Sequence, residues 1–319
     1  MLSVIANGNY YAGLGAIKGW FVFPIIFAII FFDVLKYDES LLKKSLLALF
    51  FSGVAISIVG VVYKFFDVVT FDGRLKAFWD SPNQLAMFLA IPFLIGVHFI
   101  FQDRDKIRLY TLALILVGLN LFFTFSYGAW LALTIATTII FWLKYGKKEQ
   151  KKYLTILILI FAILISLASV YKYKSMANMG ERSSLASRFT ILKSAGLMVE
   201  NNPLFGIGPG NFQEKYLEYQ KYFPPYLEWS VPQPHNIFLA FWLESGLVGL
   251  AGFIILIFCF FRDNKKAFQL NREFGMLLLA IMIYILVHGL VDTTYWRNDL
   301  AVVFWVVIAA SIYLEEKRG

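Results

Sequence analysis

The chain has 319 residues, of which 59% are apolar and only 16% are charged. Soluble globular domains are about 45–50% apolar and about 25% charged, so the composition excludes a soluble enzyme, a disordered chain and a fibrous repeat. The net charge of +8 would suit a nucleic-acid partner, but the basic residues lie between apolar runs and form no continuous patch. We therefore expect an integral membrane protein that binds membrane lipids and no nucleic acid.

Continuous apolar runs, each long enough to cross a hydrocarbon core of about 30 Å, predict about nine transmembrane helices. The runs do not alternate between apolar and polar residues, which favours helices over the strands of a membrane barrel. The fold class is therefore an all-α, polytopic helical bundle, treated as a single membrane domain over residues 1–319. The predicted spans are residues 18–35, 45–63, 83–101, 109–126, 128–143, 153–171, 236–261, 274–291 and 300–314.

Lys and Arg gather in alternate connections, for example in residues 144–152 and 262–272. Short cytoplasmic loops retain positive charge, so we place these connections and the carboxy terminus in the cytoplasm. The amino terminus and the long loop 172–234 then lie outside, at the periplasmic or outer face. Because an outer amino terminus without a signal peptide is unusual, we expect that earlier spans are missing from this polypeptide.

The outer loop 172–234 is too long to be a simple connector, so we expect it to be structured. Residues from Ser187 onward predict an amphipathic helix that lies on the membrane or the bundle and ends before Pro203. The glycine-rich segment 206–212 fits no nucleotide-binding motif and predicts either a tight turn or an anion-binding nest. Tyr and Trp side chains between 216 and 229 form a membrane-interface belt or stack on sugars. The predicted helical stripe is Arg188, Leu192, Ala195 and Val199.

Polar residues suited to catalysis share the outer side. His235 and His288 lie there with Arg188, whereas His98 falls near the cytoplasmic end of a span and is expected to be structural. A neutral imidazole, with an ordinary pKa near 6.5, can accept a hydroxyl proton, and a guanidinium can hold a pyrophosphate. These residue types suggest transfer from a lipid pyrophosphate; the alternative is that they are interfacial anchors.

Glu244 falls inside a predicted span, where an acidic residue is costly and suggests a function or a pairing with a neighbouring helix. Together with the many spans, it favours a competing function as a lipid-linked glycan flippase or another transporter. No internal repeat of the kind found in many transporters is visible. Gly246, Gly249 and Gly252 follow at intervals of three and predict a face for close helix packing.

Three motifs resemble those of the O-antigen ligase and O-antigen polymerase superfamily of bacterial envelope glycosyltransferases. Residues 188–192 (Arg-Phe-Thr-Ile-Leu) fit an Arg-x-x-x-Leu pattern, and residues 235–249 fit a His-Asn-x9-Gly-x-x-Gly pattern. Between them, residues 202–212 resemble the outer-loop signature of the family. The likeness extends upstream to residues 73–75, 81–86 and 124–129, and the similar core covers about residues 109–262.

The resemblance implies a GT-C-like bundle and metal-independent, inverting transfer without a cofactor. The donor would be a glycan linked to undecaprenyl pyrophosphate, at the outer side of the bacterial cytoplasmic membrane. The acceptor would be a lipid-core sugar in a ligase, or another lipid-linked repeat unit in a polymerase, and this alternative stays open. By the match to the family motifs, His235 would deprotonate the acceptor hydroxyl and Arg188 would hold the pyrophosphate.

Many members of the superfamily carry an arginine where this chain has Tyr127. A second catalytic arginine is therefore in doubt, and Arg74 or Arg297 is the candidate replacement. We expect Asp292 and Asp299 either to orient the acceptor or to support the residues that contact the substrate. The predicted substrate-binding residues are Arg74, Asn211, Asn236, Asp292 and Arg297, and no metal ligand is predicted.

Overall fold

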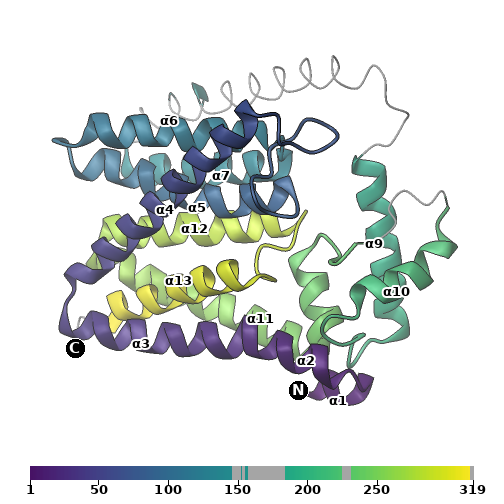
Figure 1. The fold of residues 1–319 in the computed structure, drawn as a ribbon. Helices are drawn as coiled ribbons and strands as arrows, with labels where there is room; N and C mark the ends of the chain where they lie inside the picture. The colour runs from purple at the N-terminus through teal and green to yellow at the C-terminus, as the bar shows by residue number, and fades with distance from the viewer. Residues whose placement is uncertain (146–151, 153–154, 157–183, 225–230, 317–319) are drawn as a thin grey trace. The chain divides into compact units, whose positions relative to one another are not determined.

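A computed structural model describes residues 1–145, 152, 155–156, 184–224 and 231–316 of the chain. Every regular element among these residues is a helix (Figure 1). Seven of the helices are long and apolar enough to cross a membrane. The predicted fold class is confirmed, and the chain is a multi-pass helical membrane protein.

The helices follow the apolar runs of the sequence. The chain begins with α1 (Leu2–Asn7), and α2 (Tyr10–Ile17), the π-helical turn η1 (Lys18–Val22) and α3 (Phe23–Tyr37) then continue from one to the next. The remaining elements are α4 (Ser40–Phe65), α5 (Pro82–Gln102), α6 (Ile107–Phe123), α7 (Tyr127–Lys144), α9 (Ser184–Asn201), α10 (Phe212–Tyr219), the 3-10 turn η2 (Gln220–Tyr222), α11 (Ile237–Leu270), α12 (Arg272–Gly289) and α13 (Asn298–Glu316).

Eight of the nine predicted spans coincide with helices, and the ninth, at 153–171, lies outside the described residues. The largest difference is in α11, which continues to Leu270 although its apolar run ends near 261. Asn264 in this polar extension is buried, and its side-chain amide donates to the carbonyl oxygen of Gly275 at 3.1 Å. Packing onto α12 therefore extends the helix through residues that hydropathy alone assigns to a loop.

Two compact units make up the chain: Met1–Phe31, Met179–Asp263 and Leu286–Ala309 form the first, and Phe32–Asn178, Asn264–Ile285 and Ala310–Gly319 form the second.

In the second unit, α5 packs against α4, α6 and α7 and is buried along most of its length (Figure 1). Buried Asn120 of α6 donates to the carbonyl oxygen of Ser57 in α4 at 3.0 Å, which satisfies a polar group inside the bundle. His98 is 3% exposed and stacks on Phe274, with ring centroids 5.5 Å apart. This environment fits the structural role expected of His98.

In the first unit, the described part of the outer loop folds into its own small core. The helices α9 and α10 lie side by side (Figure 1) and pack over Leu243 of α11. The buried face of α9 is formed by Ile191, Ala195 and Met198. The buried face of α9 therefore lies about one residue before the predicted stripe, and Leu192 and Val199 of that stripe are only half-buried. The difference arises because α10 and α11 cover the face that carries Ile191, Ala195 and Met198.

The outer loop is also joined to a break in α11. Gly246 adopts φ 75° and ψ −177° inside the helix, a conformation that is essentially confined to glycine. The loop takes over the backbone groups that the break leaves without helical partners. Ile207 donates its amide to the carbonyl oxygen of Leu243 at 2.7 Å, and the amide of Leu247 donates to the carbonyl oxygen of Leu204 at 2.9 Å.

The three glycines at 246, 249 and 252 therefore do not form the single close-packed face that their spacing predicts. A side chain at Gly246 would collide with the backbone of the outer loop, because its Cβ would lie 2.5 Å from the carbonyl oxygen of Leu204. At Gly252, no described atom lies within 4 Å of the equivalent position. The glycine spacing thus reflects a helix break with a docked loop at its first position, rather than one continuous packing face.

Candidate active site

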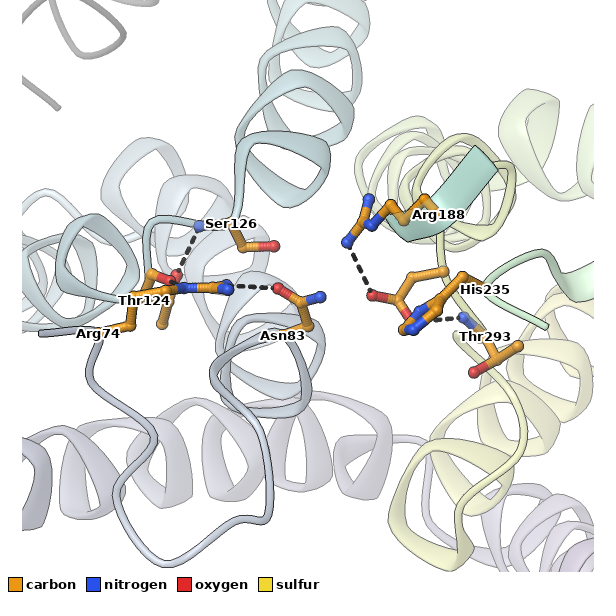
Figure 2. Close-up of polar contacts among 8 residues, drawn as sticks. Arg74, Asn83, Thr124, Ser126, Arg188, His235 and Thr293 are labelled. Atoms are coloured by element: carbon orange, nitrogen blue, oxygen red, sulfur yellow. Dashed lines mark hydrogen bonds and ion pairs between the residues drawn. The ribbon is translucent and has the colours of Figure 1, made fainter. Parts of the chain in front are cut away.

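One carboxylate, that of Asp292, joins the two residues expected to perform chemistry. A guanidinium nitrogen of Arg188 lies 3.6 Å from one oxygen of Asp292, and Nδ1 of His235 lies 3.1 Å from the other. Both side chains point toward this carboxylate (Figure 2). The three residues come from α9, from the turn before α11 and from the connection between α12 and α13.

The turn that carries His235 is held by its neighbour in the sequence. Asn236 caps α11, because its side-chain oxygen accepts the amides of Phe238 and Leu239 at 3.0 Å each. Its side-chain amide donates to the carbonyl oxygen of Leu290 at 3.0 Å. His235 itself adopts a positive φ of 51°, which turns the chain sharply into the helix. The predicted substrate-binding residue Asn236 therefore uses its side chain to hold the turn that carries His235.

Asp292 is ionised in this environment. Burial raises the pKa of its carboxyl, but His235, His288 and Arg188 together lower the pKa by more, so that it lies well below its ordinary value. The amide of Thr293 also donates to the oxygen that faces His235, at 2.9 Å (Figure 2). The protein thus keeps a negative charge on a buried side chain.

The two partners of Asp292 remain accessible from outside the protein. The side chains of Arg188 and His235 are 23% and 26% exposed, against 3% for Asp292. With an ionised carboxylate beside Nδ1, the proton of a neutral imidazole resides on that nitrogen, and Nε2 is left to accept another. The guanidinium offers several donors to an anion in the same place. The site can therefore bind an oxyanion beside a general base.

The glycine-rich segment forms a turn that binds a carboxylate of the chain itself. The amide of Gly210 donates to the side chain of Glu244 at 2.7 Å, and Glu244 is 1% exposed. Asn211, predicted to bind substrate, donates to the carbonyl oxygen of Ile207 at 2.7 Å, and its side-chain oxygen accepts from Asn9. The segment and the intramembrane acid, which were separate features in the sequence, are one structural feature.

Arg74 lies in the second unit, where its guanidinium is held in a fixed position. Its Nε donates to the carbonyl oxygen of Thr124 and its Nη2 to the side-chain oxygen of Asn83, both at 2.7 Å (Figure 2). The turn at Thr124 leads directly into Tyr127, the first residue of α7. Sequence reasoning noted the segments that contain Asn83 and Thr124 but did not predict that they hold Arg74.

Arg297, the other candidate for a second arginine, pairs with Asp299 at 3.2 Å. Residues that sequence reasoning gave no role also contribute to the site. Thr293 donates to Asp292, and His288 of α12 is fully buried and acts electrostatically on the same carboxylate. The outer position of His288 was the one signal in the sequence that pointed to it.

Residues 112–254 match a family model described as O-antigen ligase. A comparison with curated proteins found no matching sequence. The matched range contains Arg188 and His235, whereas Arg74 and Asp292 lie outside it.

Proposed function

We propose that this membrane protein moves a glycan from undecaprenyl pyrophosphate to an acceptor hydroxyl, because residues 112–254 match a family model described as O-antigen ligase. The match supports a glycosyltransferase-like activity on lipid-linked glycans. In our proposal the reaction takes place at the outer side of the bacterial cytoplasmic membrane, as the distribution of Lys and Arg among the loops indicates. The proposed acceptor is a lipid-core sugar, and the alternative acceptor is another lipid-linked repeat unit.

The observation that carries the proposal is the position of Asp292 between Arg188 and His235. A transferase that uses a diphosphate leaving group needs a base for the acceptor and a cation for the leaving group, close enough to act on one substrate. Both groups contact the same carboxylate here. The shared partner supports a single site that performs both tasks.

In the proposed reaction, Nε2 of His235 takes the proton of the acceptor hydroxyl. The acceptor oxygen then attacks the anomeric carbon of the donor, and the bond between that carbon and the pyrophosphate oxygen breaks. Undecaprenyl pyrophosphate leaves with the electron pair, while Arg188 neutralises part of its charge. Attack from the side opposite to the leaving group inverts the anomeric centre. The cationic side chain makes a metal ion unnecessary in this scheme.

Arg74 is the proposed second phosphate-binding arginine. Its guanidinium is bound to Thr124, three residues before the position at which many family members carry an arginine. A guanidinium that reaches this turn from another segment supports the replacement of a missing arginine at Tyr127. Arg297, which is paired with Asp299, is the less favoured candidate.

The test is release of undecaprenyl pyrophosphate by the full chain in proteoliposomes supplied with a lipid-linked oligosaccharide and acceptor. Removal of a general base lowers rates by about 10²- to 10⁴-fold, so His235→Ala is expected to lose activity to this extent. Arg188→Ala is compared with Lys193→Ala, because both remove one positive charge from α9. We expect a large loss only for Arg188→Ala.

Wild-type activity in His235→Ala would contradict the assigned base, and equal losses in the two α9 variants would contradict the specific role of Arg188. Envelope glycans of a deletion strain distinguish the two acceptors. Loss of long chains with single units retained on the acceptor indicates a polymerase. Loss of every unit from the lipid core indicates a ligase.

A further inference from the structure

A polar hollow of about 460 Å³ lies at the end of α9 that is remote from Arg188. Its walls come from the last turns of α9 and from the end of α10 with η2, which lie beside each other in Figure 1. The lining residues are Leu197, Asn201, Glu218, Tyr219, Lys221 and Tyr222. Among them only Leu197 is apolar, so the hollow combines aromatic rings with hydrogen-bonding groups.

The two tyrosine rings stand almost at right angles, with centroids 6.3 Å apart and planes at 71°. Asn201 donates to the hydroxyl of Tyr219 at 3.1 Å, which fixes that ring. The ammonium of Lys221 lies 5.2 Å from the centre of the Tyr222 ring, and Tyr222 is 59% exposed. The hollow thus presents one fixed ring and one accessible ring, with a carboxylate, an amide and an ammonium around them.

This combination matches the surface of a sugar. A pyranose ring has apolar C–H faces that pack on aromatic rings, and its rim of hydroxyls donates to carboxylates and accepts from amides and ammonium groups. The alternative is an aromatic belt, whose amphipathic rings lie at the headgroup level of a membrane. A carboxylate and an ammonium that line the same hollow as the two rings favour a sugar instead. The Glu218 carboxylate in this hollow also pairs with Lys215 at 3.0 Å, so the environment is hydrated and charged.

The position of the hollow indicates which sugars it would hold. Asn201 lies thirteen residues after Arg188 on α9, which is about 20 Å along a helix axis. That distance exceeds the length of one sugar ring. A glycan bound by its pyrophosphate at Arg188 would therefore reach the hollow only with units further along its chain.

We propose that the hollow between α9 and η2 is a glycan subsite that binds sugar units remote from the reacting pyrophosphate. This assignment rests on the proposed function, since it assumes that the chain handles an oligosaccharide. It adds a contact with substrate that the cluster of Arg188, His235 and Asp292 does not provide. The consequence is a preference for long glycans over short ones.

Binding is tested with the full chain in detergent, by saturation-transfer NMR and calorimetric titration. The probe is the lipid-free oligosaccharide that mild acid releases from the cell's own lipid-linked glycans. Loss of an aromatic platform is expected to weaken binding about tenfold in Tyr222→Ala, whereas Tyr222→Phe should stay within about twofold of wild type. Tyr11→Ala removes another exposed tyrosine of the same unit and should leave binding unchanged.

Transfer assays separate the subsite from the chemistry. Tyr222→Ala is expected to raise the KM for multi-unit substrates and to leave kcat/KM unchanged for substrates with a single sugar. Varying the donor length and the acceptor length in turn shows which of the two glycans occupies the hollow. If the released oligosaccharide binds and Tyr222→Ala weakens binding while no donor is ever turned over, the subsite stands and the proposed function fails. Equal binding by Tyr222→Ala and wild type overturns the subsite, whatever the transfer activity.

Discussion

Replacing Gly246 with Ala tests whether the broken helix α11 and the outer loop depend on each other. The residue has φ 75° and ψ −177°, and an added Cβ would lie 2.5 Å from the carbonyl oxygen of Leu204 and 3.0 Å from the Cα of Phe205. Both neighbours are backbone atoms, so no side-chain rotation can relieve the clash. The chain has to shift where Leu204 accepts the amide of Leu247 at 2.9 Å.

The expected cost has two parts. Holding a residue with a side chain in this region of φ and ψ costs about 1–3 kcal/mol. Displacing the loop and weakening a buried backbone hydrogen bond adds about 1–3 kcal/mol. The sum, roughly 2–6 kcal/mol, is a large part of the roughly 5–15 kcal/mol that stabilises a typical folded protein.

The assay is the thermal unfolding midpoint of the full chain in detergent, with Gly252→Ala as the matched control. Gly252 lies in the same helix, has a helical backbone and has no described atom within 4 Å of its Cβ position. Alanine there should stabilise the helix by about 0.5–1 kcal/mol. We expect Gly246→Ala to lower the midpoint by roughly 3–9 °C and Gly252→Ala to leave it equal or raise it. Equal midpoints for the two variants would refute this account of the break.

Two further variants test the turn and the carboxylate of the site. Asn236→Ala is expected to cost about 1 kcal/mol of stability by removing the cap of α11. Asn236→Asp keeps the acceptor of the cap and loses only the donation to Leu290, so its loss of stability should be smaller than that of Asn236→Ala. Equal losses in unfolding measurements would argue against capping. Asp292→Asn is expected to lower the unfolding midpoint at pH 7. Because the folded-state pKa of Asp292 is lowered, its carboxylate stabilises the fold above the unfolded-state value of about 3.9, and this contribution is lost as the pH falls toward the folded-state pKa. The difference in unfolding midpoint between Asp292→Asn and wild type should therefore become smaller below about pH 4. A difference in midpoint that becomes larger there would contradict an ionised Asp292 in the folded protein.

The helices could be predicted from the sequence because a bilayer imposes a simple rule. A segment in hydrocarbon has to satisfy its own backbone hydrogen bonds, so a long apolar run is a helix. The rule does not cover polar segments, and so it missed the continuation of α11 to Leu270, which depends on contacts of Asn264 with α12. It also cannot tell that Gly246 breaks a helix, since the loop that fills the break is distant in sequence.

The site could be predicted in part. The charge of the loops and the motif residues predict that Arg188 and His235 lie on one side of the membrane. The carboxylate between them could not be assigned in this way, because Asp292 is 57 residues from His235 and follows a different helix. The same limit applies to Gly210 and Glu244, which are 34 residues apart and share a hydrogen bond.

The two contacts of Asp292 differ in a way that bears on the proposed reaction. Charge-assisted hydrogen bonds are usually about 2.7–2.9 Å long, so the 3.6 Å contact with Arg188 is a loose ion pair, whereas the 3.1 Å contact with His235 is closer. A diphosphate carries more charge and more acceptor oxygens than one carboxylate, so we expect it to draw Arg188 away and leave Asp292 to the imidazole. Donor binding would then leave the Asp292 carboxylate to His235 alone and strengthen the contact that orients the proposed base.

In Asp292→Asn the rate constant kcat should fall while the KM for the donor stays equal or decreases, because the guanidinium of Arg188 no longer has a competing anion. A KM that rises in proportion to the loss of kcat would show instead that Asp292 serves to position Arg188.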